Sequence, residues 1–338
     1  MSLPISLRIL AVLITLAGNS HAALADRPSL ELPLDCAMGV DCFIQNHFDH
    51  VPGKEAADYT CGPLVYDGHD GVDLRALTMT QMREGVDVLA SAPGIVVGVR
   101  NSMEDILVDD IGRDALDGRD AGNGVRIDHG DGWITQYSHM MKGSVIVAVG
   151  DTVNVGQVLG KMGLSGNTQF PHVHLGVSHD GIDIDPFAGT LEAYVCGDPI
   201  EPLWSPQALA QLDYVAGGLL QAGFADESAD YRAAREGTYN DFVLHEDTGA
   251  LVFWSEFFGL LEGDQIRFEL VFPDNFDTIT NTVAMDRNRA AQFNFVGRRV
   301  PEAGWPQGTY VGMVSVLRDI NGTEQVIAST IETITFQP

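Results

Sequence analysis

The sequence of 338 residues is poor in positive charge and, beyond its first residues, has no long apolar run. Lys and Arg number 19 against 47 Asp and Glu, which gives a formal net charge of −28. Such an acidic surface repels polyanions, which argues against nucleic acid and anionic membranes as partners. No later segment is long and apolar enough for a transmembrane helix. The mature chain is therefore expected to be soluble, with no membrane span.

The one marked apolar run lies at the N-terminus and is too short to span a bilayer. Arg8 precedes the ten residues ILAVLITLAG, and Ser20-His21-Ala22 and Ala23-Leu24-Ala25 give two small-x-small cleavage patterns. Residues 1–25 are thus predicted to be a secretory signal peptide, and the mature protein is expected to be periplasmic or extracellular. No cysteine follows LAG, so a lipid-modified N-terminal cysteine is not indicated.

Cysteine is scarce: the chain has four, at Cys36, Cys42, Cys61 and Cys196. Their spacings match no common zinc motif, and an even number in an exported protein favours disulfides. Three pairings are possible. We favour Cys36 with Cys42 and Cys61 with Cys196, since the second bond would join the two ends of the segment that carries the motifs described below.

Long helical periods are missing as well, and strand patterns separated by glycine turns take their place. Residues 26–60 have weak periodicity and are expected to be irregular. Residues 61–198 are typical of a compact antiparallel sheet domain, and residues 199–238 of a linker with short helices. Residues 239–338 predict a β-sandwich of immunoglobulin-like type. The predicted fold class is therefore all-β, with two domains.

Within residues 61–198, one strand and one hairpin can be placed by pattern. PGIVVGVR, residues 93–100, predicts a strand. GVRIDHGDGWITQYSH, residues 124–139, predicts a hairpin that turns at Asp131-Gly132, because Asp-Gly between alternating residues is a strong turn signal. Alternation along its second arm predicts that one face carries Trp133, Thr135, Tyr137 and His139.

A pair of histidines lies in the predicted strand PHVHLGV. Residues two apart on a strand point to the same face, so His172 and His174 project together while Val173 and Leu175 face the core. Two polar residues on the solvated side of a strand are the simplest interpretation of this pair alone. Two neighbouring imidazoles can also bind a metal, or one can bind it while the other moves protons.

A second motif, DGHDGVD, supplies the remaining ligand types. His69 and Asp73 are four residues apart, so an extended segment places them on the same side. Gly71 between them allows either a bend of the backbone or the close approach of another chain segment. Together with one histidine of the pair they would give three ligands and leave a fourth tetrahedral position for water, which is typical of catalytic zinc. His139 in TQYSHM and the other histidine of the pair are then candidate proton acceptors.

Taken together, HDGVD, HGDGWITQYSHM, GDTVNVGQVLGKMGLSGNTQFPHVHLGV and DPF resemble the LytM/lysostaphin-type zinc metallopeptidases of family M23. The pattern of that family is HxGxD, a strand ending in YxHL, then GxTG and HxH. The resemblance covers about residues 61–190. It implies a compact, antiparallel two-sheet M23-type peptidase domain with a narrow groove, which cleaves peptide bonds in peptidoglycan.

The same resemblance implies a role for each of five residues. His69, Asp73 and His174 match the ligands of Zn²⁺, whereas His172 and His139 match the two histidines that do not bind it. One of these two would be the general base, and the other would orient the water or stabilise the oxyanion. We favour His172 as the base.

The sequence departs from the family pattern in a few places. Met140 replaces the usual Leu, which is a near-isosteric change. SGNTQFPHVH lacks the usual Thr-Gly and carries Gln169-Phe170 in addition, which affects the expected rim of the groove. The acidic loop 101–122 is longer than a minimal domain needs and could cover part of the groove. Its Asp spacing does not match an EF-hand, so a solvated loop is a better interpretation than a calcium site.

The predicted function is that of a secreted zinc metalloendopeptidase that hydrolyses peptide bonds of peptidoglycan by a zinc-activated water. Two alternatives stay open: a non-catalytic, wall-binding activator of another hydrolase, and a zinc endopeptidase acting on extracellular proteins. Residues 26–60 could be inhibitory if His47 or His50 reached the zinc, although loop histidines at the surface explain them more simply. The role of the C-terminal domain and the oligomeric state are not predicted.

Overall fold

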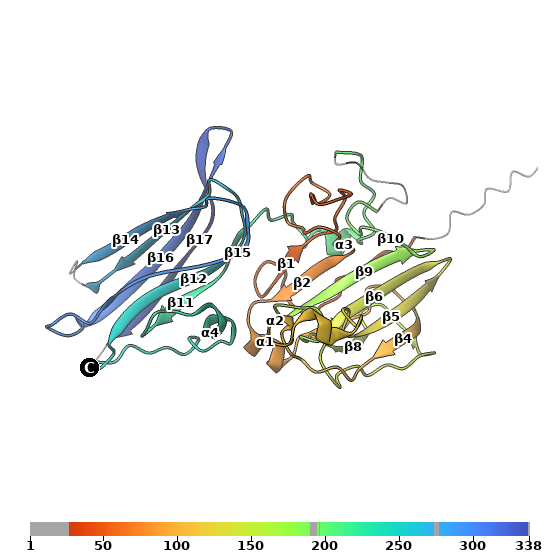
Figure 1. Cartoon of the computed structure of the whole chain (residues 1–338), viewed down its shortest axis with the longest axis horizontal. Helices are drawn as coiled ribbons and strands as arrows, with labels where there is room; N and C mark the ends of the chain where they lie inside the picture. The colour runs from red at the N-terminus through yellow and green to blue at the C-terminus, as the bar shows by residue number, and fades with distance from the viewer. Residues whose placement is uncertain (1–26, 190–194, 196, 274–276, 337–338) are drawn as a thin grey trace, which may run out of the picture.

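The computed structural model describes residues 27–189, 195, 197–273 and 277–336, and β-strands dominate these parts of the chain (Figure 1). The helices are short: α1 (Met79–Glu84), α2 (Val108–Ile111), the 3₁₀ helix η1 (Arg113–Leu116), α3 (Pro206–Leu209) and α4 (Tyr231–Arg235). Among the described residues, no helix has the length and apolarity needed to cross a membrane.

An eight-stranded antiparallel sheet organises the N-terminal part of the chain. Its order is β1-β2-β9-β6-β5-β4-β7, with β10 paired to β9. The strands are β1 (Cys42–Asn46), β2 (Val72–Ala76), β4 (Gly94–Arg100), β5 (Asn123–Gly130), β6 (Trp133–Met140), β7 (Thr152–Val153), β9 (His172–His179) and β10 (Ile182–Asp183). A two-stranded sheet of β3 (Asp87–Leu89) and β8 (Val158–Lys161) shares its core. The strand at 93–100 and the hairpin turn at Asp131-Gly132 are confirmed.

The C-terminal β region, residues 218–336, contains two further antiparallel sheets. One has the order β11-β12-β15, with β11 (Gly218–Ala225), β12 (Ala250–Leu260) and β15 (Arg289–Arg299). The other has the order β14-β13-β16-β17, with β13 (Gln265–Val271), β14 (Thr278–Ala284), β16 (Gly308–Ile320) and β17 (Thr323–Phe336). Side chains from both sheets, such as Phe253 and Phe268, form one core. Two packed antiparallel sheets are thus present, whereas their immunoglobulin-like type stays a prediction.

Two strands lie in segments where the sequence indicates none. β1 lies within residues 26–60 and forms an edge of the large sheet, paired with β2. β11 lies within residues 199–238 and pairs with β12, so the C-terminal β region begins at Gly218 rather than at residue 239. Glycines obscure the alternation of β11; at Gly223, for example, a Cβ would lie 2.9 Å from the Trp254 ring.

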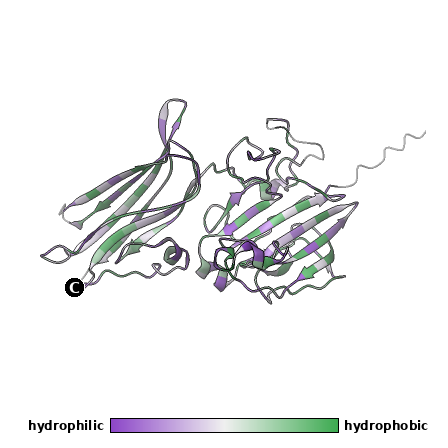
Figure 2. Cartoon of the chain, in the orientation of Figure 1, coloured by the Kyte–Doolittle hydropathy of each residue, from purple (hydrophilic) through white to green (hydrophobic). Residues whose placement is uncertain are grey.

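Strand register places the polar motifs on one face of the large sheet and the core on the other. Asp73 of β2 lies beside His174 of β9, which lies beside Ser138 of β6. Their neighbours Leu74, Val173 and Leu175 are fully buried in the core. The alternation of hydrophobic and hydrophilic residues is visible along these strands in Figure 2.

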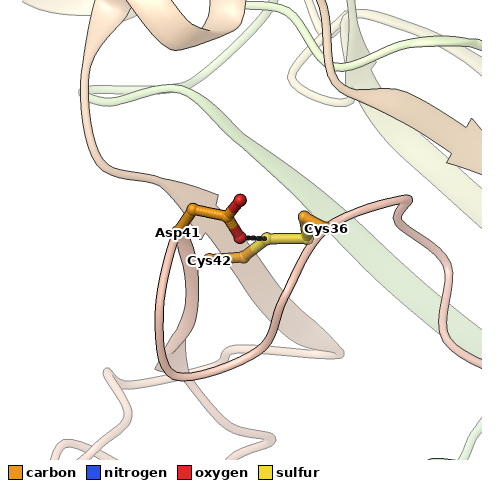
Figure 3. Close-up of side chains that lie close together, drawn as sticks. All are labelled: Cys36, Asp41 and Cys42. Atoms are coloured by element: carbon orange, nitrogen blue, oxygen red, sulfur yellow. Dashed lines mark hydrogen bonds between the residues drawn. A yellow bond between two sulfur atoms is a disulfide. The ribbon is translucent and has the colours of Figure 1, made fainter.

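One of the two predicted disulfides lies within the described residues. Cys36 and Cys42 are bonded and close a short loop before β1, next to Asp41 (Figure 3). This confirms the first pairing. Cys196 lies outside the described residues, so its pairing with Cys61 stays a prediction; among the described residues no cysteine is free.

Candidate metal centre

Three side chains converge on the polar face of the sheet with the geometry of a metal site. The pairs are His69 Nε2–Asp73 Oδ1 at 3.1 Å, His69 Nε2–His174 Nδ1 at 3.1 Å, and His174 Nδ1–Asp73 Oδ1 at 3.0 Å. Zinc–ligand bonds of about 2.0–2.1 Å in a tetrahedron place ligand atoms about 3.3 Å apart. The donor atoms therefore form one nearly equilateral face of the tetrahedron that zinc prefers, and these residues fit the ion.

In each of the three side chains, the nitrogen or oxygen that does not face the other two donors contacts a neighbouring polar group. His69 Nδ1 donates to the backbone carbonyl of His47 at 2.5 Å, which leaves Nε2 free to bind a metal. Asn46 Nδ2 donates to Asp73 Oδ2 at 2.8 Å, and Asp70 Oδ1 lies 3.3 Å from His174 Nε2. Such outer contacts orient ligands and raise their basicity in metal sites.

The pKa values of His174 and Asp73 are shifted in opposite directions from their usual values. Burial alone would lower the pKa of His174, but hydrogen bonds to Asp70 and Asp73 outweigh it and raise the pKa to about 9. Burial likewise acts to raise the pKa of Asp73, yet the charges of His69 and His172 and the histidine hydrogen bonds bring it well below its usual value. A metal ion bound here would therefore displace a proton from His174, as is usual for imidazole ligands.

Gly71 explains how His174 can reach this position. A Cβ at Gly71 would lie 2.6 Å from His174 Nε2 and 2.6 Å from the carbonyl oxygen of Leu175. Any side chain there would displace the imidazole, because real Cβ atoms do not make such contacts. The expected close approach at Gly71 is thus confirmed.

The donor atoms of His69, Asp73 and His174 form a triangle, called the donor triangle below. His172 and His139 lie beside it, and the rings of these two histidines are 4.6 Å apart. His172 Nδ1 contacts the Phe170 carbonyl at 2.9 Å and the Thr168 hydroxyl at 2.9 Å, while its Nε2 lies 3.5 Å from Asp73 Oδ1. His139 Nδ1 donates to the Ser165 carbonyl at 2.8 Å. These contacts assign the proton of each neutral ring to Nδ1 and leave each Nε2 as an acceptor.

Burial keeps both rings neutral. Burial, reinforced by the neighbouring His172 and His174, lowers the pKa of His139 to about 3. Burial also lowers the pKa of His172, but the Asp73 carboxylate and the Phe170 carbonyl oppose this shift. His172 is therefore the better proton acceptor of the two.

The predicted face of His139 is wrong, although its ring lies 4.6 Å from that of His172. Thr135 and Tyr137 lie opposite Val177 and Leu175 on the core side, and strict alternation would place His139 with them. His139 instead has a positive φ of 61°, and its N–H bonds to the Ala121 carbonyl. Left-handed backbone costs an L-residue about 1–2 kcal/mol, and here it turns the imidazole onto the polar face.

The histidines of segment 26–60 do not reach the donor triangle with their rings. His47 is buried among aromatic rings, at 4.9 Å from Phe187, 5.3 Å from Tyr59 and 5.4 Å from Tyr214. His50 Nε2 instead contacts Asp185 Oδ2 at 2.7 Å. The segment therefore supports the site through Asn46 and the His47 carbonyl, and neither imidazole blocks it. Sequence reasoning missed both contacts, because the segment carries no recognisable period.

Replacing His47 by phenylalanine is expected to make the metal-free protein more resistant to acid. Burial lowers the pKa of His47 to about 4, so the unfolded chain takes up a proton below pH 6.5 that the folded chain accepts only below pH 4. Stability due to the neutral ring is fully present above pH 6.5 and is lost progressively as pH falls from 6.5 to 4. The aromatic surroundings suit phenylalanine, and His47 Nδ1 has no hydrogen-bond partner among the described residues.

Urea unfolding with a chelator at pH 7 and pH 5 would measure this effect. The variant should lose less stability between the two pH values than the original chain does, by about 2 kcal/mol. The control His245→Asn removes an exposed histidine. Equal pH dependence of His47→Phe and the original chain would contradict the expectation.

A cavity of about 430 Å³ opens next to the candidate metal centre. Asp73, His139 and His172 line its floor, and the rim residues Asn167–Phe170 line one side. The acidic loop contacts this rim, since Val108 N donates to the Thr168 carbonyl and Gln169 Nε2 to Asp109. The donor triangle is thus placed beside a space large enough for part of a peptide.

The antiparallel β domain holds a His-Asp-His donor set and two neutral histidines beside a cavity. These are the features of a metallopeptidase. Residues 67–186, about a third of the chain, match the model of Peptidase family M23. The chain therefore contains an M23 peptidase domain, and this segment includes all five predicted site residues.

Solved structures that resemble the chain include three peptidase structures. A zinc-containing peptidase from Vibrio cholerae is 22% identical, with a TM-score of 0.32, over 47% of this chain and 39% of that one. A mutant catalytic domain of the prophage-encoded M23 protein EnpA from Enterococcus faecalis is 24% identical, with a TM-score of 0.31. The match covers 44% of this chain and 91% of that one. The catalytic domain of the antimicrobial peptidase lysostaphin from Staphylococcus simulans is 24% identical, with a TM-score of 0.26. The match covers 35% of this chain and 76% of that one.

Proposed function

We propose that the protein is a zinc metalloendopeptidase that hydrolyses peptide bonds of peptidoglycan. The observation that carries the proposal is the donor triangle of His69, Asp73 and His174, with sides of 3.0–3.1 Å, beside two neutral histidines in a family M23 domain. All five residues are in place, which favours an enzyme over a non-catalytic activator of another hydrolase.

In this proposal, His69 Nε2, Asp73 Oδ1 and His174 Nδ1 hold the zinc ion. A zinc ion bound in this way supplies a Lewis acid that acidifies water and polarises a carbonyl. The chain supplies the rest: Asn46, Asp70 and the His47 carbonyl keep the donors oriented. The low pKa of Asp73 keeps its carboxylate charged, which suits a cation.

His172 moves the proton. During hydrolysis, the water oxygen bonds to the carbonyl carbon and one water proton passes to His172 Nε2. The bond from carbon to the amide nitrogen then breaks, and His172 returns this proton to the leaving amine. His172 suits this task because Nδ1–H is held by the Phe170 carbonyl and Asp73 stabilises the protonated ring.

His139 has a different part in the proposal. Its Nδ1–H is bound to Ser165 and its pKa of about 3 keeps it neutral, so Nε2 carries no proton to donate. It can accept a hydrogen bond from the attacking water but cannot donate one to an oxyanion. We therefore assign His139 to orienting the water.

Export and the type of the C-terminal β region are part of the same proposal. The signal-peptide pattern of residues 1–25 supports a periplasmic or extracellular enzyme, which is where peptidoglycan is accessible. Sheets of three and four antiparallel strands packed on one core support an immunoglobulin-like sandwich.

Digestion of purified peptidoglycan tests the proposal. Residues 26–338 with one equivalent of zinc should release soluble muropeptides with new amino termini, and mass spectrometry would identify the bond. A chelator should stop the release, and added zinc should restore it. If the enzyme cleaves unfolded extracellular proteins and releases no muropeptides, its substrates are extracellular proteins and not peptidoglycan. If it cleaves neither substrate, the proposal is overturned.

A further inference from the structure

The cavity beside the metal centre has walls from two parts of the chain. Its floor belongs to the M23 domain, whereas Tyr231 and Arg235 of α4 and Ala290 and Ala291 of β15 come from the C-terminal β region. The two parts are joined at this cavity, since Gln45 Nε2 donates to the Ala290 carbonyl at 3.0 Å. They also meet where the rings of Phe43 and Phe258 lie 6.1 Å apart. Figure 1 shows α4 and β12 on the side of this region that faces the M23 domain.

A buried carboxylate anchors this junction. Glu256 of β12 has an exposed fraction of 0% and lies 2.8 Å from Arg235 and 3.9 Å from Arg75, which is also fully buried. Burying three charges is costly unless they are paired. Because Arg75 belongs to β2, two residues after Asp73, Glu256 ties the C-terminal β region to a strand that carries a predicted zinc ligand.

From this anchor, contacts lead to the rim of the cavity and to His172. Arg235 Nη1 donates to the Gln169 carbonyl at 3.1 Å, and its guanidinium lies 6.0 Å from the centre of the Phe170 ring. The Arg75 guanidinium lies 4.9 Å from the same ring. Phe170 in turn lies 4.5 Å from the His172 ring, and its carbonyl accepts the His172 Nδ1 proton.

We infer that the C-terminal β region completes the substrate groove of the peptidase, with Arg235, held by Glu256, as a positioning residue for the rim 167–170 and, through Phe170, for His172. The inference rests on the proposed function, which makes the cavity a peptide groove. It gives the C-terminal β region a part in the reaction beyond stability.

Two residues of β15, Ala290 and Ala291, form part of the cavity wall. Ala291 lies opposite Phe258 in the register of β12 and β15, so it shares the face that packs toward Phe43 of the M23 domain. Its methyl group is exposed and leaves the cavity open. β15 is also an edge strand of its sheet.

Substitution of Arg235 tests the positioning role. Arg235→Lys keeps a positive charge for Glu256 but loses the planar fork that also reaches Gln169. We expect kcat to fall about tenfold with zinc content unchanged, and amide hydrogen exchange in residues 165–172 to become about tenfold faster. Arg235→Ala should show larger changes in the same direction. The control Arg267→Ala removes a half-exposed arginine of the same region, paired with Glu324 at 3.6 Å, and should change neither readout.

Substitution of Ala291 tests the wall. Ala291→Trp fills the cavity from the C-terminal side and should raise KM for a peptidoglycan peptide about tenfold with a much smaller change in kcat. Ala284→Trp, at an exposed position on β14 of the other sheet, is the matched control. An unchanged KM in Ala291→Trp would show that the C-terminal β region does not form part of the substrate groove.

The two proposals fail in different ways. If the original chain cleaves no peptide, the proposed function is wrong, and exchange at residues 165–172 still decides whether Arg235 holds the rim. If the original chain is active but Arg235→Lys matches it in kcat and exchange, the inference is overturned and the proposed function stands. A lower melting temperature with kcat and exchange unchanged would assign Arg235 a purely structural role and would also overturn the inference.

Discussion

Replacing His174 by alanine is expected to remove zinc from the protein and to abolish peptide hydrolysis. His174 Nδ1 supplies one corner of the donor triangle, at 3.1 Å from His69 Nε2 and 3.0 Å from Asp73 Oδ1. Loss of an outer hydrogen-bond partner typically costs 10–100-fold in metal affinity. Loss of a ligand itself should therefore lower zinc affinity by more than about 100-fold. Activity should vanish because only two protein donors would remain.

Zinc titration and metal analysis of purified protein would measure this loss. Binding to the folded state alone stabilises a protein, so zinc should raise the melting temperature of the original chain and not that of His174→Ala. His179→Ala is the matched control: it lies on the same strand β9, with its ring 4.6 Å from Trp133, outside the donor triangle. Zinc affinity in His174→Ala equal to that of the control would show that His174 is not a ligand.

Strands β4, β5, β6 and β9 could be predicted from sequence because their signals are local, whereas β1 and β11 could not. A period of two places His172 and His174 on one face, and Asp-Gly marks the turn between β5 and β6. The motifs alone indicated one metal site made by His69, Asp73 and one histidine of the pair. The choice of His174 as the ligand came from the resemblance to family M23. Register in the structure supplies the physical reason, since β2, β9 and β6 are neighbours in the sheet.

The contacts that orient the site could not be predicted, because they join segments far apart in the sequence. Asn46 and the His47 carbonyl come from a segment with no clear period, and Glu256 reaches Arg75 from another part of the fold. The orientation of His139 could not be predicted for a different reason. Its positive φ breaks the alternation of β6, and the sequence has no glycine there to signal it.

Replacing His172 by alanine is expected to lower kcat by about 10²–10⁴-fold, the usual contribution of a general base, while zinc stays bound. His172 is not a corner of the donor triangle, since its Nε2 lies 3.5 Å from Asp73 Oδ1 and its Nδ1 is occupied by Phe170 and Thr168. The ring has an exposed fraction of only 4%, so its removal leaves a space beside the cavity. KM should change little, because the lost interaction is made mainly in the transition state.

Added imidazole separates proton transfer from a structural role. Imidazole can enter the space left by His172→Ala and accept the proton there, so it should restore part of kcat in a concentration-dependent way. In His139→Ala it should restore much less, because a ring that only orients the water must be held in place by its bond to Ser165. If imidazole rescues His139→Ala and not His172→Ala, the two roles are reversed. If His172→Ala loses zinc as His174→Ala does, His172 is a ligand, and the base must be sought at His139.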